Sequence, residues 1–146
     1  MSVSTLDVAL NDSSTEQLTV ARVGDLYIGF PLDTVQEVLM EAAITPVPLA
    51  ESGFVGLINV RGDILSVVDL ATRLGMARDE PQRQNFVLTR SARGLMAVTV
   101  DRVTDVIHAP STAREEVQGN ASEAFTHAYA LPNRLVLVLD VERLIG

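Results

Sequence analysis

Short apolar runs, separated by polar turns, follow one another along the chain from Leu18 onward. The runs that favour β-strands most clearly lie at 64–68, 86–89, 95–100 and 135–139. Turn-forming residues such as glycine and asparagine stand between them. Many short strands joined by polar turns are typical of a barrel or a sandwich. The pattern therefore predicts an all-β fold with short helices, and residues 111–128 are the one stretch whose periodicity allows a longer helix.

The chain contains an internal repeat. Residues 27–39 read YIGFPLDTVQEVL and align with LMAVTVDRVTDVI at 95–107, with a constant offset of 68. A second pair of segments, at 64–70 and 135–141, aligns with an offset of 71. Two copies of one unit predict two similar small barrels. Chance similarity between valine-rich strands is the alternative explanation.

Each repeat unit places an aspartate at the end of an apolar run. Its carboxylate can accept hydrogen bonds from backbone N–H groups two or three residues further on, which starts a helical turn. After Asp33 and Asp101, apolar residues at i, i+3, i+4 spacing are expected to share one face of such a turn. These residues are Val35, Val38 and Leu39 in the first copy and Val103, Val106 and Ile107 in the second. After Asp69 and Asp140, we expect a helix of one or two turns that a glycine, Gly75 or Gly146, can close.

The charge of the chain narrows the choice of partners. The sequence has 19 acidic and 11 basic residues, for a net charge of −8. A surface this acidic repels phosphate backbones and anionic lipid headgroups, so we expect neither nucleic-acid binding nor membrane-surface binding. Partners with basic or apolar docking faces are favoured.

The first sixteen residues differ in composition from the rest. They lack the basic and apolar regions of a signal peptide, and their content of Ser, Thr and Asp predicts a disordered tail at 1–16. Residues 17–146 are then expected to form a single domain of two barrel subdomains. No apolar stretch reaches the roughly 18–20 residues that cross a bilayer. We therefore expect a cytoplasmic protein without direct membrane insertion.

The residues needed for catalysis or metal binding are not grouped in the sequence. Cysteine is absent, and His108 and His127 are nineteen residues apart with no acidic or second histidine partner at ligand spacing. No phosphate-binding or nucleophile-elbow motif occurs. Asp69 and Asp140 follow strands, where a catalytic carboxylate would also fit, but capping explains both. The sequence predicts a protein that is not an enzyme and that binds neither a metal nor a cofactor.

Residues 53–75 read GFVGLINVRGDILSVVDLATRLG, and this segment resembles the CheW-like domain family. The positions that match the family pattern are Gly56, Ile58, Asn59, Arg61, Gly62, Ile64, Val67, Asp69 and Leu70. The chain departs from the pattern at Val60, where the family has leucine, and at Ser66, where proline is common. Shorter family elements recur in the expected order at 27–39, 45–48, 100–106 and 134–140. The resemblance thus covers about residues 18–146.

The resemblance implies a fold and a function. The family fold is a pair of five-stranded SH3-like β-barrels related by a pseudo-twofold axis, which agrees with the internal repeat. Family members are scaffolds of signalling arrays. One surface holds the regulatory domain of a CheA-type histidine kinase, and a groove between the barrels takes the helical-hairpin tip of a chemoreceptor. Contacts with other CheW-like domains in array rings are a further option that the sequence leaves open.

The family's receptor-facing groove maps onto Val35, Glu37, Gly56 and Arg61. Val35 would give an apolar contact, and Gly56 would let a partner helix approach the backbone closely. Arg61 offers a planar head with several donors for a receptor carboxylate or carbonyl. Glu37 would pair with Arg61 or with a basic receptor residue. The kinase-facing residues stay unassigned.

Each of these assignments has a plainer alternative. Val35 fits a core position equally, Gly56 and Gly62 suit turns that need positive φ, and Arg61 beside a glycine suits a solvated turn. Two other functions also stay open. One is an adaptor of a chemosensory-like pathway that controls surface motility or gene expression, and the other is a small-ligand-binding barrel module.

Overall fold

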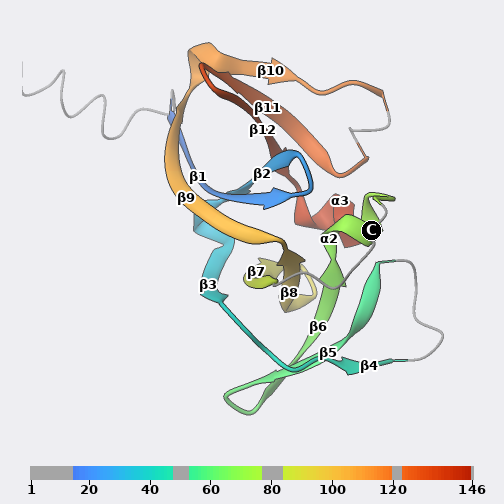
Figure 1. Cartoon of the computed structure of the whole chain (residues 1–146). Coiled ribbons are helices and arrows are strands. Elements are labelled where there is room, and N and C mark those ends of the chain that lie inside the picture. The colour runs from blue at the N-terminus through green and yellow to red at the C-terminus, as the bar shows by residue number, and fades with distance from the viewer. Residues whose placement is uncertain (1–14, 48–52, 77–83, 120–122, 146) are drawn as a thin grey trace, which may run out of the picture.

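The described part of the molecule is built almost entirely of β-strands. The computed structural model describes residues 15–47, 53–76, 84–119 and 123–145. Within them, twelve strands form two six-stranded sheets, with only two short α-helices (Figure 1). The all-β class with short helices is confirmed. Each sheet has six strands, where the family resemblance implied barrels of five.

The first sheet has the strand order β10-β11-β12-β2-β1-β9. Its strands are β1 (Thr15–Val23), β2 (Leu26–Pro31), β9 (Arg102–Pro110), β10 (Arg114–Glu116), β11 (Phe125–Leu131) and β12 (Arg134–Leu139). The second sheet has the order β3-β7-β8-β6-β5-β4. Its strands are β3 (Val35–Leu39), β4 (Thr45–Pro46), β5 (Phe54–Val60), β6 (Asp63–Asp69), β7 (Asn85–Ser91) and β8 (Gly94–Val100). The helices are α2 (Leu70–Arg73) and α3 (Val141–Ile145), with 3₁₀ turns at Leu32–Thr34 and Ser111–Ala113.

The internal repeat of the sequence is visible in the strand pairing. Each sheet consists of two groups of three antiparallel strands. The two groups meet at one parallel pair, β12 with β2 in the first sheet and β6 with β8 in the second. The register of the two parallel pairs is the same, because Val138 pairs with Gly29 as Val67 pairs with Ala97. These residues are equivalent under the offsets of 71 and 68. The repeat is therefore a structural duplication.

The chain passes between the sheets twice. It leaves the first sheet after β2, builds the whole second sheet from β3 to β8, and returns to the first sheet with β9. Figure 1 shows β9 curving along β1, far in sequence from it. Each sheet therefore contains strands from both copies of the repeat, so neither copy corresponds to one sheet alone.

Two expectations from residue spacing were wrong. The segments that follow Asp33 and Asp101 are the strands β3 and β9, and the pairing of each contains a bulge. In β9 the exposure alternates along the strand, so Val106 is exposed whereas Val103 and Ile107 are partly buried, and the three do not share one face. Residues 111–128 contain no α-helix in their described part, since β10 and β11 pair with each other there. Residues 120–122 lie outside the described residues.

Asp69 and Asp140, which follow the second pair of repeated segments, cap helices as expected. The carboxylate of Asp69 accepts from the backbone N–H of Thr72 at 3.2 Å, at the start of α2. The carboxylate of Asp140 accepts from the backbone N–H of Glu142 at 2.9 Å, at the start of α3. Gly75 follows α2 with φ +75°, whereas Gly146 lies outside the described residues.

Three clusters of buried side chains form the core. One cluster lies within each sheet, around Leu65 and Leu88 in the second sheet and around Leu18 and Val138 in the first. The third and largest joins the two sheets and includes α2 and α3. The seam between the two halves is therefore filled by core side chains where this cluster lies.

The N-terminal boundary of the fold lies slightly earlier than expected. Strand β1 begins at Thr15, so Thr15 and Glu16 belong to the first sheet, although we had placed both in a disordered tail. Residues 1–14 lie outside the described residues. Pro48, the last residue of the family element at 45–48, lies outside them as well.

Candidate interaction surface

The four residues assigned from the family resemblance all lie in or beside the second sheet. Val35 and Glu37 belong to β3, an edge strand, and Gly56 belongs to β5. Arg61 stands in the turn between β5 and β6. The fold thus brings together Glu37 and Arg61, although β7 and β8 lie between β3 and the β5–β6 hairpin in the strand order.

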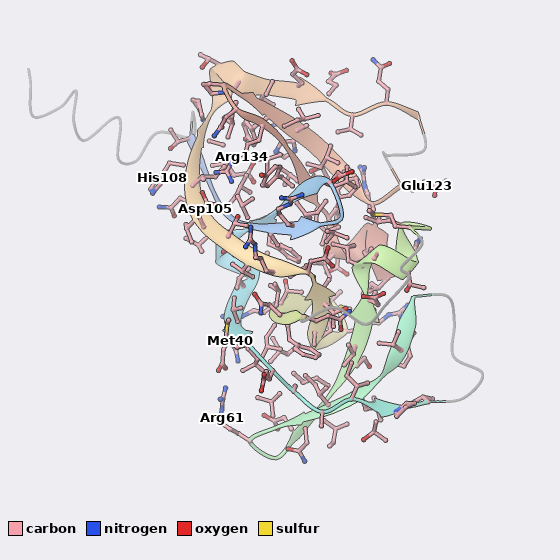
Figure 2. The ribbon with its side chains drawn as sticks, viewed as in Figure 1. Met40, Arg61, Asp105, His108, Glu123 and Arg134 are labelled. Atoms are coloured by element: carbon pink, nitrogen blue, oxygen red, sulfur yellow. The ribbon has the colours of Figure 1, made fainter. Side chains whose placement is uncertain are left out.

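Arg61 and Glu37 form a two-pronged ion pair. The Arg61 Nη1 donates to Glu37 Oε2 at 3.2 Å, and Nη2 donates to Oε1. The guanidinium hydrogen bonds lower the pKa of the Glu37 carboxyl, and Glu37 in turn raises the pKa of Arg61. The Arg61 side chain is 66% exposed and the Glu37 side chain 30%. The pair orients a guanidinium that stays open to solvent (Figure 2).

The backbone of Arg61 is strained. Its φ is +51°, and it is the one non-glycine residue with positive φ in the described part of the chain. Gly62 follows with φ +93°, and the Asn59 side chain accepts from the Gly62 N–H at 2.9 Å. Two successive positive φ values make the tight hairpin turn between Val60 and Asp63. A non-glycine residue in this conformation costs on the order of 1 kcal/mol, and such strain is found preferentially at functional sites.

Gly56 has an internal reason to be a glycine. Its φ is +152°, and a Cβ at this position would overlap the backbone carbonyl of Thr45 on the neighbouring strand β4. The missing side chain therefore lets β4 and β5 approach each other. The role of Gly56 in admitting a partner helix stays a prediction.

Val35 is half-buried and packs against the central core cluster, so it serves the core. Two exposed apolar side chains lie in the same part of the chain as the ion pair, Met40 just after β3 and Ile64 at the start of β6. Figure 2 shows Met40 and Arg61 at the same side of the second sheet. We call Glu37, Met40, Arg61 and Ile64 the Arg61 face.

The first sheet carries a second acid–arginine pair. Asp105 on β9 is the repeat counterpart of Glu37, and it accepts from Arg134 at 3.0 and 2.6 Å. The hydrogen bond from Arg134 lowers the pKa of Asp105. Arg134 and Arg22 both lie over the ring of Tyr27, each 5.3 Å from its centroid. This pair is embedded in a stacked network, with Arg134 only 15% exposed.

His127 has an acidic partner that its sequence neighbourhood does not reveal. Its Nε2 lies 2.7 Å from Oε1 of Glu16, and the hydroxyl of Tyr129 donates to the same oxygen at 2.8 Å. Burial raises the pKa of Tyr129 to about 12. The sequence places no acidic partner at ligand spacing from His127, and the partner that the fold supplies, Glu16, is 111 residues away along the chain. The cluster holds the start of β1 against β11.

The described residues contain no cluster that suits catalysis by a metal. No group of three histidine or acidic side chains there is placed to hold an ion. Among the described residues, no helix is long and apolar enough to cross a membrane. Asp69 is occupied as a cap and as the acceptor of the Thr99 hydroxyl at 2.7 Å. The fold defines a class of protein, a duplicated β-sheet module, in which the Arg61 face is the candidate interaction surface.

The chain belongs to the CheW-like domain family, whose model matches residues 17–146. It is 30% identical over 122 residues to a chemotaxis protein CheW of Thermotoga maritima, covering 81% of this chain and 80% of the relative. It is 42% identical over 83 residues to Protein FrzA of Myxococcus xanthus, covering 54% of this chain and 52% of the relative. The solved structure of the scaffolding protein TtCheW from Thermoanaerobacter tengcongensis superposes with a TM-score of 0.79 at 20% identity, covering 86% and 89% of the two chains.

Proposed function

We propose that this protein is a non-enzymatic adaptor that couples chemoreceptors to a CheA-type histidine kinase in a chemosensory array. The observation that carries the proposal is Arg61, a charged residue held in a strained backbone conformation with its guanidinium oriented and exposed. The hairpin turn accounts for the positive φ itself, but glycine would adopt it with less strain, so the choice of arginine at this position calls for a further reason. Family membership and the chemotaxis and scaffolding names of the relatives support the same function.

The receptor-facing surface in this proposal is the Arg61 face together with Val35 and Gly56. A receptor tip is a helical hairpin, whose apolar side chains need an apolar contact surface with polar groups at its rim. Met40 and Ile64 would supply apolar contacts, and Arg61 would donate to a receptor carboxylate or carbonyl. Glu37 would fix the direction of the guanidinium before the receptor arrives, which lowers the entropy lost on binding.

The kinase partner in this proposal is the regulatory domain of the histidine kinase. The test is reconstitution of receptor-containing membranes, the kinase and this protein, with kinase autophosphorylation as the readout. We expect kinase activity to depend on the protein, and Arg61→Gly to reduce that dependence. Arg102→Ala, at an exposed arginine on β9, is the matched control. Kinase activity that is the same with and without the protein would sink the proposal.

A second candidate is an adaptor for a chemosensory-like pathway with another output, such as surface motility or gene expression. The 42% identity to Protein FrzA supports this second candidate. The two candidates use the same kind of interfaces, so their partners distinguish them. Co-purification from the native cell, followed by identification of the receptor and kinase, decides between them. A bound metabolite without a kinase or receptor would favour a ligand-binding module instead.

A further inference from the structure

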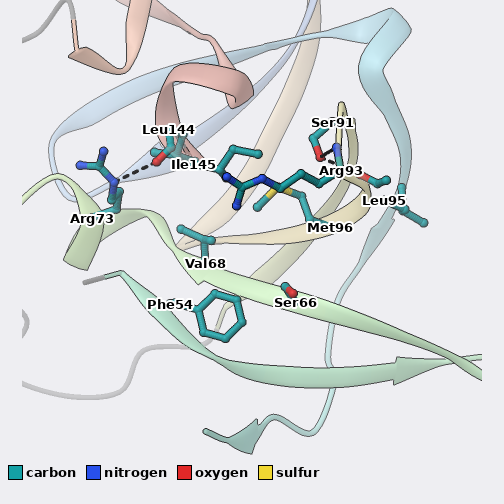
Figure 3. A pocket seen from close by; sticks show the side chains of 11 residues that line it. Phe54, Ser66, Val68, Arg73, Ser91, Arg93, Leu95, Met96, Leu144 and Ile145 are labelled. Carbon is teal, nitrogen blue, oxygen red and sulfur yellow. Dashed lines mark hydrogen bonds between the residues drawn. The ribbon is translucent and has the colours of Figure 1, made fainter. Parts of the chain in front are cut away.

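A pocket with a volume of about 370 Å³ opens beside α2 and α3. Its walls include apolar side chains from four elements of the fold, Phe54 of β5, Val68 of β6, Met96 of β8 and Leu144 of α3 (Figure 3). A volume of this size is at the lower end of the range for ligand pockets, and an apolar lining is typical of them. The pocket involves the two helices and the β7–β8 turn, whereas the Arg61 face involves β3 and the β5–β6 turn.

The repeat relates this pocket to a place in the first sheet that is already occupied. The counterpart of the β7–β8 turn is the β1–β2 turn, which contains Gly24. The Met76 side chain covers that turn, with its Cε 2.5 Å from where a Cβ of Gly24 would stand. Met76 also packs against the central core cluster, and its N–H is held by the carbonyl of Ala71 at 2.8 Å. A methionine thus fills the site in the first sheet that corresponds to the pocket in the second.

Two differences keep the pocket of the second sheet open. Ser66 lines it, whereas the repeat counterpart of Ser66 is Leu137, which packs against the core. In addition, no described side chain fills this pocket in the way that Met76 covers the β1–β2 turn in the first sheet. The small polar Ser66 and the open volume beside it leave room for an apolar side chain of the size of methionine or leucine.

The charge around the pocket is opposite to that of the whole chain. Arg73 and Arg93 line it, and none of its described lining residues is acidic, in a chain with a net charge of −8. Arg73 is fixed by the hydrogen bond from its Nε to the carbonyl of Leu144 at 2.9 Å. The nearby Glu142 carboxylate is engaged with the Ala92 N–H at 2.7 Å. An occupant with carboxylates beside its apolar group is therefore favoured.

We propose that this pocket binds a methionine or leucine side chain of a partner protein, on a segment with acidic residues on both sides of it. The bound side chain takes the place that Met76 has in the first sheet, and the flanking carboxylates pair with Arg73 and Arg93. This docking site goes beyond the coupling of receptor and kinase proposed above. It can be tested without either partner.

The probe is a twelve-residue peptide with one central methionine flanked by glutamates, and its control carries serine in place of methionine. The full chain, labelled with ¹³C at methionine methyl groups, is titrated with each peptide in the millimolar range. We expect the Met96 methyl signal to shift with the methionine peptide and not with the serine peptide. An unmoved Met96 signal with the methionine peptide overturns the proposal.

Two variants locate the binding. Ser66→Leu introduces the residue that the first sheet already has at the equivalent place, so we expect it to fold and to abolish the shift by filling the pocket. Arg93→Gln is expected to weaken binding several-fold, because one of two charge contacts is lost, whereas Arg102→Gln is expected to leave it unchanged. Undiminished binding by folded Ser66→Leu, or equal effects of the two arginine variants, would contradict the proposed site. Receptor–kinase coupling is not measured in these titrations, so a failure here leaves that function unaffected.

Discussion

Each half of the molecule pairs an acidic side chain with an arginine, and the two pairs differ in their exposure to solvent. Glu37 and Asp105 are equivalent in the repeat, and each pairs with an arginine across its sheet. The arginines are not equivalent, since Arg134 begins strand β12, whereas Arg61 stands in the turn itself. In the first sheet the arginine is 15% exposed and stacked on Tyr27, and in the second it is 66% exposed.

This difference separates a structural pair from an interaction pair. A solvent-exposed ion pair contributes roughly 0–1 kcal/mol to stability, which does not by itself justify a strained backbone at Arg61. The pair of the first sheet has two hydrogen bonds, at 3.0 and 2.6 Å, and its arginine lies over an aromatic ring. Duplication thus supplied an acid at the same position of both sheets, and the fold joins each acid to a different arginine, so that the two sheets carry two different pairs. We infer that the first serves the fold and that the second serves a partner.

The largest expected effect is on stability, from Arg134→Ala. Its loss leaves Asp105 without its strongest partner and removes one cation from the face of Tyr27. Because Asp105 is 40% exposed, water can solvate part of its charge. We therefore expect a loss of about 2 to 3 kcal/mol, less than for a fully buried pair. Urea unfolding followed by circular dichroism measures it.

The matched control is Arg61→Ala, which should change the free energy of unfolding by about 1 kcal/mol or less. Equal destabilisation by the two substitutions would remove the distinction between the pairs.

The second effect is on binding, from Arg61→Gly. Glycine accepts positive φ without strain, so the free energy of unfolding should stay within about 1 kcal/mol of the wild type. Receptor binding should weaken by about 2 kcal/mol, or roughly 30-fold, if the guanidinium is an anchor. Co-sedimentation with receptor-containing membranes measures the affinity. The receptor affinity of Arg61→Lys should lie between those of the wild type and Arg61→Gly, because an ammonium cannot donate in the forked geometry.

A large fall in melting temperature with Arg61→Gly would make Arg61 structural. Unchanged receptor affinity would remove Arg61 from the receptor-facing surface.

A third and smaller effect comes from Tyr27, the residue that most clearly distinguishes the two halves. Its repeat counterpart in the second sheet is Leu95. Tyr27→Leu keeps an apolar side chain and removes the ring that Arg22 and Arg134 share. We expect a loss of about 1 kcal/mol. In an Arg134→Ala background the same substitution should have less effect, and simple additivity of the two losses in urea unfolding would argue against a shared network.

Local features of the sequence predicted much of this structure. The strands, the duplication and the caps at Asp69 and Asp140 follow from apolar runs and from contacts within three residues. The family pattern singled out Glu37 and Arg61 and left two possible partners for Glu37, Arg61 or a basic receptor residue; the structure contains the pair with Arg61. The interpretation of 111–128 failed because pairing between β10 and β11 overrides local periodicity.

What could not be predicted depends on contacts between distant segments. His127 and Glu16 meet only because β1 and β11 share a sheet, and nothing in either neighbourhood indicates the contact. The close approach of Thr45 to Gly56 and the positive φ of Arg61 likewise depend on the register of β4, β5 and β6. Sequence alone therefore located the candidate surface without showing that one of its residues is strained.

The smallest expected effect is on the pH dependence of stability, and it also compares the two halves. Arg134 holds the pKa of Asp105 below its ordinary value in the folded state. The unfolded chain therefore binds this proton more readily as the pH falls, so the stabilisation is complete above the unfolded pKa, roughly 4. It is lost as the pH falls through the folded pKa.

Asp105→Asn should therefore be less stable than the wild type at neutral pH, and the difference should shrink as the pH is lowered from neutral through about 4 into the acidic range. Glu37→Gln should follow the same direction with a smaller change, because that pair is more exposed and water screens it. Unfolding free energies at both ends of this range test the order. A larger acid-dependent change for Glu37 than for Asp105 would mean that the exposed pair, and not the stacked one, holds the fold together.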